Sequence, residues 1–406
     1  MKKYFVILVA VTMAVTTGLF AQDSENIQTT KTAWELGREF EILEDSTVNY
    51  LMPVFQMKKH EETFAINDQT KWDWVQVYPT VLSRLTNENN SNKELVNQYD
   101  QFRGRNSFIS IEKALHINDD ALNYLIQKSK DERVVMLNEN HFIPNHRILA
   151  EILIDSLYNY GFRYLAMEGI YESDIVLNER RFAITSTGYY TREPMMANLI
   201  RKAIDKGYYV FGYDFFEDVK DREKNGAYNI IQKSIAKDSI GKVFVLAGHG
   251  HINEAETTPH REMMARMFFL QSGIDPLTIH QEGFRNEETY LMFLDKTAIT
   301  TGRIICDIFI TNNIDYDLFA EKSGYKNYEI SIPSEIAARA QTESLMYVVS
   351  IFKANEYQKD IKAIPVYNYV LNCGVSNISV KLPDDTYFYT IKDRYGKILH
   401  NGNFGR

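Results

Sequence analysis

The stretch Arg133-Val-Val-Met-Leu-Asn-Glu139-Asn-His141 is an apolar run that ends in a carboxylate and an imidazole. Three later runs have the same form, and they read Tyr164-Leu-Ala-Met-Glu168, Tyr209-Val-Phe-Gly-Tyr-Asp214 and Lys242-Val-Phe-Val-Leu-Ala-Gly-His249-Gly-His251. Short apolar runs of this kind indicate buried strands. Because helical sequence separates them, we predict that the four strands lie parallel in one sheet. Ligands bind beyond the carboxyl ends of such strands, so these acids and imidazoles are expected to face one crevice.

The segments between these runs have the periodicity of helices. The clearest helix is expected from Asn145 to Tyr160, after Pro144 and before Gly161, with an apolar stripe along one side. Further helices are expected over residues 195–207, 221–236 and 260–270, and further strands over 276–280, 290–294 and 304–310. The fold class is therefore α/β, and we expect a mainly parallel sheet flanked by helices over residues 131–362.

The two ends of the chain have different patterns from this core. Residues 22–130 have mostly helical spacing of apolar side chains, which predicts a helical N-terminal layer packed on the sheet. Residues 363–406 contain alternating runs separated by turn signals, which predicts a small antiparallel β extension.

The first 21 residues have the order of a secretory signal peptide: a basic start, an apolar stretch and Ala21 before the cleavage point. The apolar stretch is shorter than the roughly 20 residues that span a bilayer. We therefore expect an exported protein, periplasmic or secreted, with no integral membrane segment after cleavage.

The composition excludes some partners. The formal net charge is −9 and no basic patch with interleaved aromatic residues is present, so nucleic acid is not expected to bind. The chain has two cysteines, Cys306 and Cys373, whose pairing the sequence leaves open. Cys306 lies in an apolar run and is expected to be a buried thiol.

The ends of the predicted strands carry the candidate chemistry. Glu139 and His141 are two positions apart, so they face the same side of a strand, and His146 lies in the first turn of the next helix. The alternative is a turn-capping His141 and a surface ion pair at Glu139. Glu168 needs a partner because an unpaired buried charge is costly. Asp214 follows the same logic, although Glu217, Asp218 and Asp221 make a solvated acidic cluster the alternative.

The Gly248-His249-Gly250-His251 element is the sharpest local motif. An H-x-H spacing is typical of metal sites and of general-base sites. Three hypotheses follow: water activated by imidazole and carboxylate for ester or amide hydrolysis, a divalent metal held by Glu139, His141, His249 and His251, or a crevice that binds haem. The sequence has no G-x-S-x-G, GxGxxG, P-loop or HExxH motif, which disfavours serine hydrolases, nucleotide-dependent enzymes and ordinary zincins.

These motifs resemble a superfamily that contains erythromycin-esterase-like, ChaN-like haem-uptake and Tiki-type proteins. The matching elements, in order over residues 131–255, are Asn138-Glu139-Asn140-His141 with His146, Met167-Glu168-Gly169, Arg222-Glu223-Lys224-Asn225-Gly226-Ala227-Tyr228-Asn229-Ile230, and Gly248-His249-Gly250-His251. The chain departs from the family pattern at Asn138, where the family has glycine, and at Glu223, where it has aspartate.

The resemblance implies an α/β core with a site at the strand ends. It assigns catalysis to Glu139, His141, Glu168 and His251, and weaker catalytic roles to His249, His146, Arg222 and Glu223. His146, Arg222 and Tyr213 are the candidates for binding a cofactor, either a divalent metal or haem, and Arg222 is expected to contact an acidic group. We thus expect an exported hydrolase acting on a small-molecule ester or amide. The alternatives are a haem- or metal-binding uptake protein and a binding protein with a relict site.

Overall fold

A computed structural model describes residues 31–406 except 66, 87–94, 96–111, 113, 215–220, 256–261, 284–288, 295–304, 341–344 and 372–373. The predicted signal peptide and Cys373 lie outside the described residues, whereas Cys306 is a buried thiol, as expected. In the described ranges, no helix combines the length and the apolar character that crossing a membrane requires.

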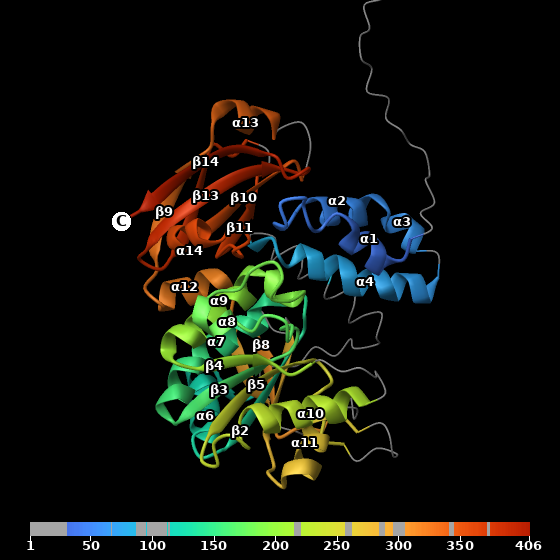
Figure 1. Ribbon diagram of the computed structural model, residues 1–406, viewed down its shortest axis with the longest axis vertical. Helices are drawn as coiled ribbons and strands as arrows, with labels where there is room; N and C mark the ends of the chain where they lie inside the picture. The colour runs from blue at the N-terminus through green and yellow to red at the C-terminus, as the bar shows by residue number, and fades with distance from the viewer. Residues whose placement is uncertain are drawn as a thin grey trace, which may run out of the picture.

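The centre of the molecule is a sheet of eight strands in the order β1-β7-β8-β6-β2-β5-β3-β4 (Figure 1). The strands are β1 (Ala114–Ile117), β2 (Val134–Glu139), β3 (Phe162–Met167), β4 (Tyr209–Gly212), β5 (Lys242–Gly248), β6 (Leu277–Gly283), β7 (Leu291–Leu294) and β8 (Ile308–Asn312). All neighbouring pairs from β8 to β4 are parallel, and β7 is antiparallel to both of its neighbours. The predicted α/β class with a mainly parallel sheet is confirmed.

Helices cover both faces of this sheet. α7 (Pro144–Asn159) and α9 (Pro194–Lys206) pack with Val135 and Leu137 of β2, whereas α10 (Arg222–Lys233) and α11 (Met264–Ser272) pack on the face of Val134 and Met136. Successive side chains of a strand point to opposite faces, so a strand buried on both faces is apolar at every position. This is why the central strands read as continuous apolar runs.

Over the residues described, the N-terminal region is mainly helical, and its buried side chains belong to the same hydrophobic core as Val135 and Leu137 of β2. α1 (Ala33–Glu39), α2 (Met52–Lys59), α3 (Glu61–Phe64) and α4 (Asp68–Leu82) lie beside the C-terminal sheet (Figure 1). The side chain of Asn49 donates to the carbonyl of Arg394 at 2.9 Å, and that of Asn368 donates to the carbonyl of Arg84 at 3.0 Å. The same region also contributes β1 and α6 (Asn118–Ser129). The strand β1 is not predicted from the sequence, because it is short and half-exposed and its apolar pattern is weak.

The C-terminal part contains a four-stranded sheet, β11-β10-β13-β14, and a two-stranded sheet, β12-β9. Its elements are β9 (Lys326–Ser331), β10 (Tyr347–Lys353), β11 (Tyr367–Val370), β12 (Asn377–Leu382), β13 (Thr386–Asp393) and β14 (Ile398–Gly405), with α12 (Tyr316–Lys322), α13 (Ser334–Arg339) and α14 (Ala354–Lys359). The predicted start at residue 363 is therefore too late. Between β8 and β11 the chain alternates short helices with strands, as it does in the core. The sequence therefore does not reveal that β9 pairs with β12 and that β10 pairs with β11 and β13.

Candidate functional site

The carboxyl ends of β2, β5 and β3 lie next to one another. In the parallel register Glu139 is opposite Gly248 and Met167 is opposite Leu246, so the residues that follow each strand emerge at one edge of the sheet. Glu139, His141, Glu168 and His251, all predicted for catalysis, come together at this edge, and Arg222 joins them from the first turn of α10.

Glu139 is a buried carboxylate whose two oxygens have different partners. Its Oε1 accepts a hydrogen bond from Nδ1 of His141 at 2.5 Å, and its Oε2 lies 2.9 Å from Nη2 of Arg147. Burial opposes ionisation, but the charges of Arg147 and His141 outweigh it and hold the pKa of Glu139 at about 2. The side chain is therefore an anion, and the alternative of a surface ion pair at Glu139 is wrong because the pair is buried.

Arg147 lies on α7, fully buried behind Glu139. Its Nη1 pairs with Oε2 of Glu193 at 2.9 Å, and its Nη2 donates to the carbonyl of His141 at 2.8 Å. Glu193 also caps α9 by accepting the amides of Met195 and Met196. The guanidinium of Arg147 thus connects the loop after β2 with the first turn of α7 and with the N-terminus of α9.

The ring of His141 is fixed from two sides. Nδ1 donates to Glu139, which leaves the lone pair on Nε2, and Nε2 lies 3.8 Å from Oε1 of Glu168. The ring of Tyr190, in the 3₁₀ turn η3 (Tyr190–Arg192), stacks on the imidazole with 3.7 Å between the centroids. The side chain of His141 remains 24% exposed, so solvent reaches it.

Glu168 lies at the centre of the group. Its Oε2 accepts the amide of Gly248, and its Oε1 lies 2.7 Å from Nη2 of Arg222. A Cβ atom at position 248 would lie 2.5 Å from Oε2, so the carboxylate reaches this amide only because residue 248 is glycine. Burial opposes ionisation, yet His251, His141 and Arg222 together lower the pKa of Glu168.

His251 lies on the other side of Glu168. Its Nδ1 is 2.8 Å from Oε2 of Glu223, which also accepts the amide of Met264, and its Nε2 is 3.7 Å from Oε1 of Glu168. Burial disfavours the imidazolium, but the two carboxylates outweigh it and raise the pKa of His251. His251 and His141 are thus two imidazoles, each held by its own glutamate, that point their Nε2 atoms toward Glu168.

Asp214 belongs to this group through Arg222. Its carboxylate binds Nε of Arg222 at 3.0 Å and Nη2 at 2.9 Å, so the expected contact of Arg222 with acidic groups is made to Asp214 and Glu168. Glu217 and Asp218, which the alternative of a solvated cluster invoked, lie outside the described residues.

His146 and Tyr213, two candidates for cofactor binding, are 1% and 3% exposed. Nδ1 of His146 accepts the amide of Asn140 at 3.0 Å, and burial lowers the pKa of His146 to about 3. Burial also raises the pKa of Tyr213. Neither side chain presents an atom to solvent, so neither is placed to ligate a haem iron as the chain is folded.

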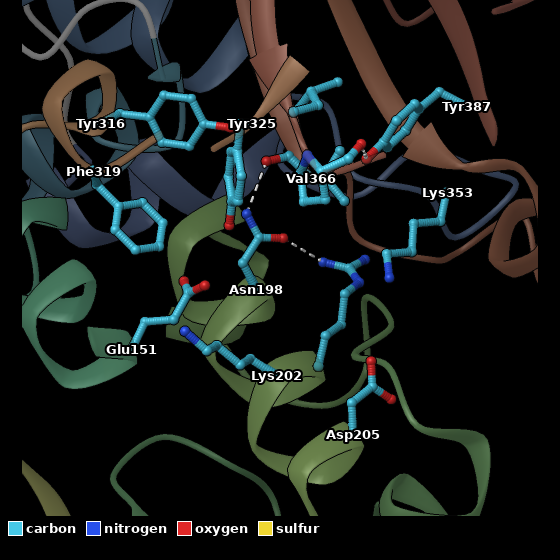
Figure 2. A pocket seen from close by; sticks show the side chains of 13 residues that line it. Glu151, Asn198, Lys202, Asp205, Tyr316, Phe319, Tyr325, Lys353, Val366 and Tyr387 are labelled. Atoms are coloured by element: carbon cyan, nitrogen blue, oxygen red, sulfur yellow. Dashed lines mark hydrogen bonds between the residues drawn. The ribbon is translucent and has the colours of Figure 1, made fainter. Parts of the chain in front are cut away.

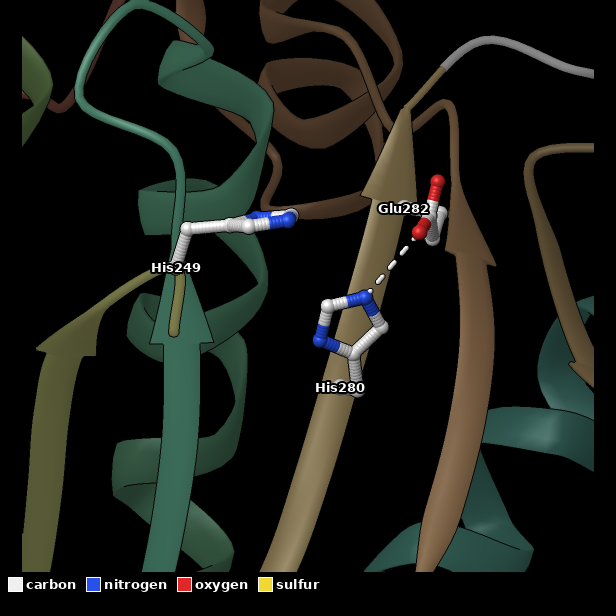
Figure 3. Close-up of side chains that lie close together, drawn as sticks. All are labelled: His249, His280 and Glu282. Carbon is white, nitrogen blue, oxygen red and sulfur yellow. Dashed lines mark hydrogen bonds and ion pairs between the residues drawn. The ribbon is translucent and has the colours of Figure 1, made fainter. Parts of the chain in front are cut away.

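The remaining member of the predicted metal set, His249, faces a different group (Figure 3). Among the described residues, the group of three potential ligands whose atoms lie within 4.8 Å of one another is His249, His280 and Glu282. The two histidines of the Gly248-His249-Gly250-His251 element therefore belong to separate groups. Glu139, His141 and His251 do not gather with His249, because the chain turns at Gly248, where the amide of His251 bonds to the carbonyl of residue 248.

The hydrogen bonds of His280 do not suit a metal. Asn138 accepts the amide of Gln281 through Oδ1, so its Nδ2 is the donor that lies 2.9 Å from Nδ1 of His280. Nδ1 must then carry the lone pair, and the proton on Nε2 points to Glu282 at 3.1 Å. A metal on Nε2 requires the opposite tautomer. The predicted set fits no better, since its carboxylate Glu139 is already paired with Arg147.

Sequence reasoning missed Arg147, Glu193 and Tyr190. Arg147 follows His146 directly, and a cation in the first turn of a helix is unfavourable unless an acid faces it, which is a usable signal. Tyr190 and Glu193 lie in a loop between β3 and α9 with no motif around them, so only the fold places them at the site.

Comparisons with known proteins leave the family open. No protein family matches the sequence, and no curated protein matches it. A solved structure of the type III effector HopBA1 is similar over 52% of this chain and 100% of that chain, with 15% identity and a TM-score of 0.36. A structure described as bacterial protein toxins is similar over 61% of this chain and 57% of that chain, with 10% identity and a TM-score of 0.30.

Proposed function

We propose that this chain is an exported hydrolase that cleaves an ester or amide bond in a small molecule with water, without a metal. The supporting observation is the symmetric arrangement around Glu168: His141 held by Glu139 on one side and His251 held by Glu223 on the other, with Nε2 atoms 3.8 and 3.7 Å from the same oxygen. The resemblance to the erythromycin-esterase-like proteins points to the same chemistry.

In this mechanism the lone pair on Nε2 of His141 takes a proton from a water molecule while the water oxygen attacks the carbonyl carbon. Glu139 stabilises the imidazolium that forms, and Tyr190 keeps the ring in place. His251, between two carboxylates that favour its protonated form, gives a proton to the leaving oxygen or nitrogen as the carbon–heteroatom bond breaks. Arg222 stabilises the negative charge on the carbonyl oxygen.

The test uses the purified mature chain and generic p-nitrophenyl esters of graded acyl length. Glu139→Gln and His251→Ala are each expected to lower kcat/KM at least about a hundredfold, in the range that loss of a general acid or base produces. The matched control is His116→Ala, which removes another histidine that pairs with a carboxylate, Asp120 at 2.7 Å, on the edge strand β1. Activity that survives both site changes would refute the assignment.

The same sample distinguishes the haem-uptake alternative. The mature protein is mixed with haem, its absorption spectrum is recorded, and its bound metals are measured. A Soret band that disappears on substitution of one histidine or tyrosine, in a protein with no esterase activity, would replace the hydrolase proposal.

A further inference from the structure

A cavity of about 200 Å³ lies between the α/β core and the C-terminal sheets, away from the strand ends that carry the candidate site (Figure 2). Helices α7, α9 and α12 form one side, and the ends of β10, β12 and β13 form the other. Figure 2 shows charged side chains of α7 and α9 below and aromatic rings above and to the left. Nothing in the proposed hydrolysis uses this cavity.

Glu151 is the unusual member of the lining. It is only 4% exposed, and no ion pair or hydrogen bond within the described residues involves its carboxyl group. The other charged side chains of the lining have partners: Arg201 with Glu356, Lys202 with Asp155, Lys353 with Asp385 and Asp205 with Arg181. A buried carboxyl group without a partner is costly, so this position calls for a donor from a bound molecule.

The aromatic residues of the lining suit a cation with an apolar body. The hydroxyl of Tyr316 donates to the carbonyl of Lys381 and that of Tyr387 donates to the carbonyl of Pro383, both at 2.7 Å. Tyr316 and Tyr387 therefore offer ring faces more than polar groups to the cavity. The ammonium of Lys202 already lies 5.9 Å from the ring centroid of Phe319, the separation at which an aromatic face attracts a cation.

We propose that this cavity binds a small organic amine, with its ammonium group on the Glu151 carboxylate and its apolar body against Phe319 and Tyr325. An anion is disfavoured because it would have to displace Asp155 from Lys202 or Asp385 from Lys353. A neutral alcohol leaves the carboxylate without a counter-charge. Burial, only partly offset by Lys202, raises the pKa of Glu151 to about 7, which is consistent with a carboxyl group that still lacks its counter-charge.

Isothermal titration of the whole mature chain with 2-phenylethylamine tests this proposal. We expect saturable binding at pH 8 and at least tenfold weaker binding to Glu151→Gln. The matched control is Glu172→Gln, which makes the same substitution at an exposed ion pair with Lys233 outside the cavity and should leave binding unchanged. The thermal unfolding of both variants is measured first, so that loss of binding is not confused with loss of fold.

Two further probes share the phenyl body, 3-phenylpropionate and 2-phenylethanol, and both are expected to bind at least tenfold more weakly than the amine. Tighter binding of the acid would show that the lysines, and not Glu151, define the site. Amine binding that is absent from the wild type, or equal in Glu151→Gln, would overturn the proposal. None of these results depends on whether the chain hydrolyses esters.

Discussion

His141 and Glu168 come from the ends of two strands that are not neighbours in the sheet, yet Nε2 of His141 lies 3.8 Å from Oε1 of Glu168. Strand β5 lies between them, and its last residue, Gly248, leaves the space through which Glu168 reaches across. The position of this carboxylate therefore depends on residue 248 having no side chain.

Gly248→Ala is expected to abolish most of the hydrolytic activity while the chain remains folded. The new Cβ would lie 2.5 Å from Oε2 of Glu168 and displace the carboxylate from its place beside His141 and His251, and a misplacement of about 1 Å in an active site costs about a hundredfold in rate. Gly250→Ala is the control, because its Cβ would meet only the flexible end of Met263 at 3.2 Å. Equal activities of the two variants would contradict the role given to Gly248.

Arg147→Met is expected to lower the free energy of unfolding by about 3–5 kcal/mol, because it leaves Glu139 and Glu193 as buried carboxylates without their counter-charge. Urea denaturation followed by circular dichroism measures this. Arg181→Met removes an exposed pair with Asp205 and should change stability by less than about 1 kcal/mol. Similar losses in the two variants would show that the pair at Glu139 is not buried in solution.

Tyr190→Leu is expected to lower kcat two- to tenfold with little change in KM, because ring stacking contributes about 0.5–1.5 kcal/mol to holding His141. Tyr190→Phe keeps the ring and should restore the wild-type kcat. A phenylalanine variant as slow as the leucine variant would instead assign the effect to the hydroxyl group.

The buried carboxyl group of Glu151 is expected to make the free energy of unfolding depend on pH. Burial, against the charges of Lys202 and Arg201 and with that of Asp155, raises its folded pKa to about 7 from 4.5. The folded state then holds a proton that the unfolded state releases, so the contribution is complete below pH 4.5 and is lost as the pH rises to about 7. The loss is about 3 kcal/mol. In Glu151→Gln this decline should be absent from unfolding curves measured between pH 5 and 8, and a decline of the same size would exclude Glu151 as its source.

The polar residues at the strand ends could be predicted from the sequence, because each directly follows a short apolar run. Glu139 and His141, two positions apart on one strand, do meet, as the alternation of a strand requires. The same rule fails for His249 and His251, because the chain leaves the strand at Gly248 and turns, so the two imidazoles diverge. Arg147 offers a local signal, a cation in the first turn of α7, but the acids that it faces depend on how α7 packs. The position of Tyr190 depends on the packing of η3, which no local pattern records.

Helix α7 carries Arg147 to the candidate site and, one turn later, Glu151 to the cavity between the core and the C-terminal sheets. α9, which packs on α7, does the same with Glu193 and Lys202. One packed pair of helices therefore connects the candidate site with the cavity. If an occupant of the cavity and a substrate at the strand ends prefer different positions of α7, each lowers the affinity of the other by the same factor.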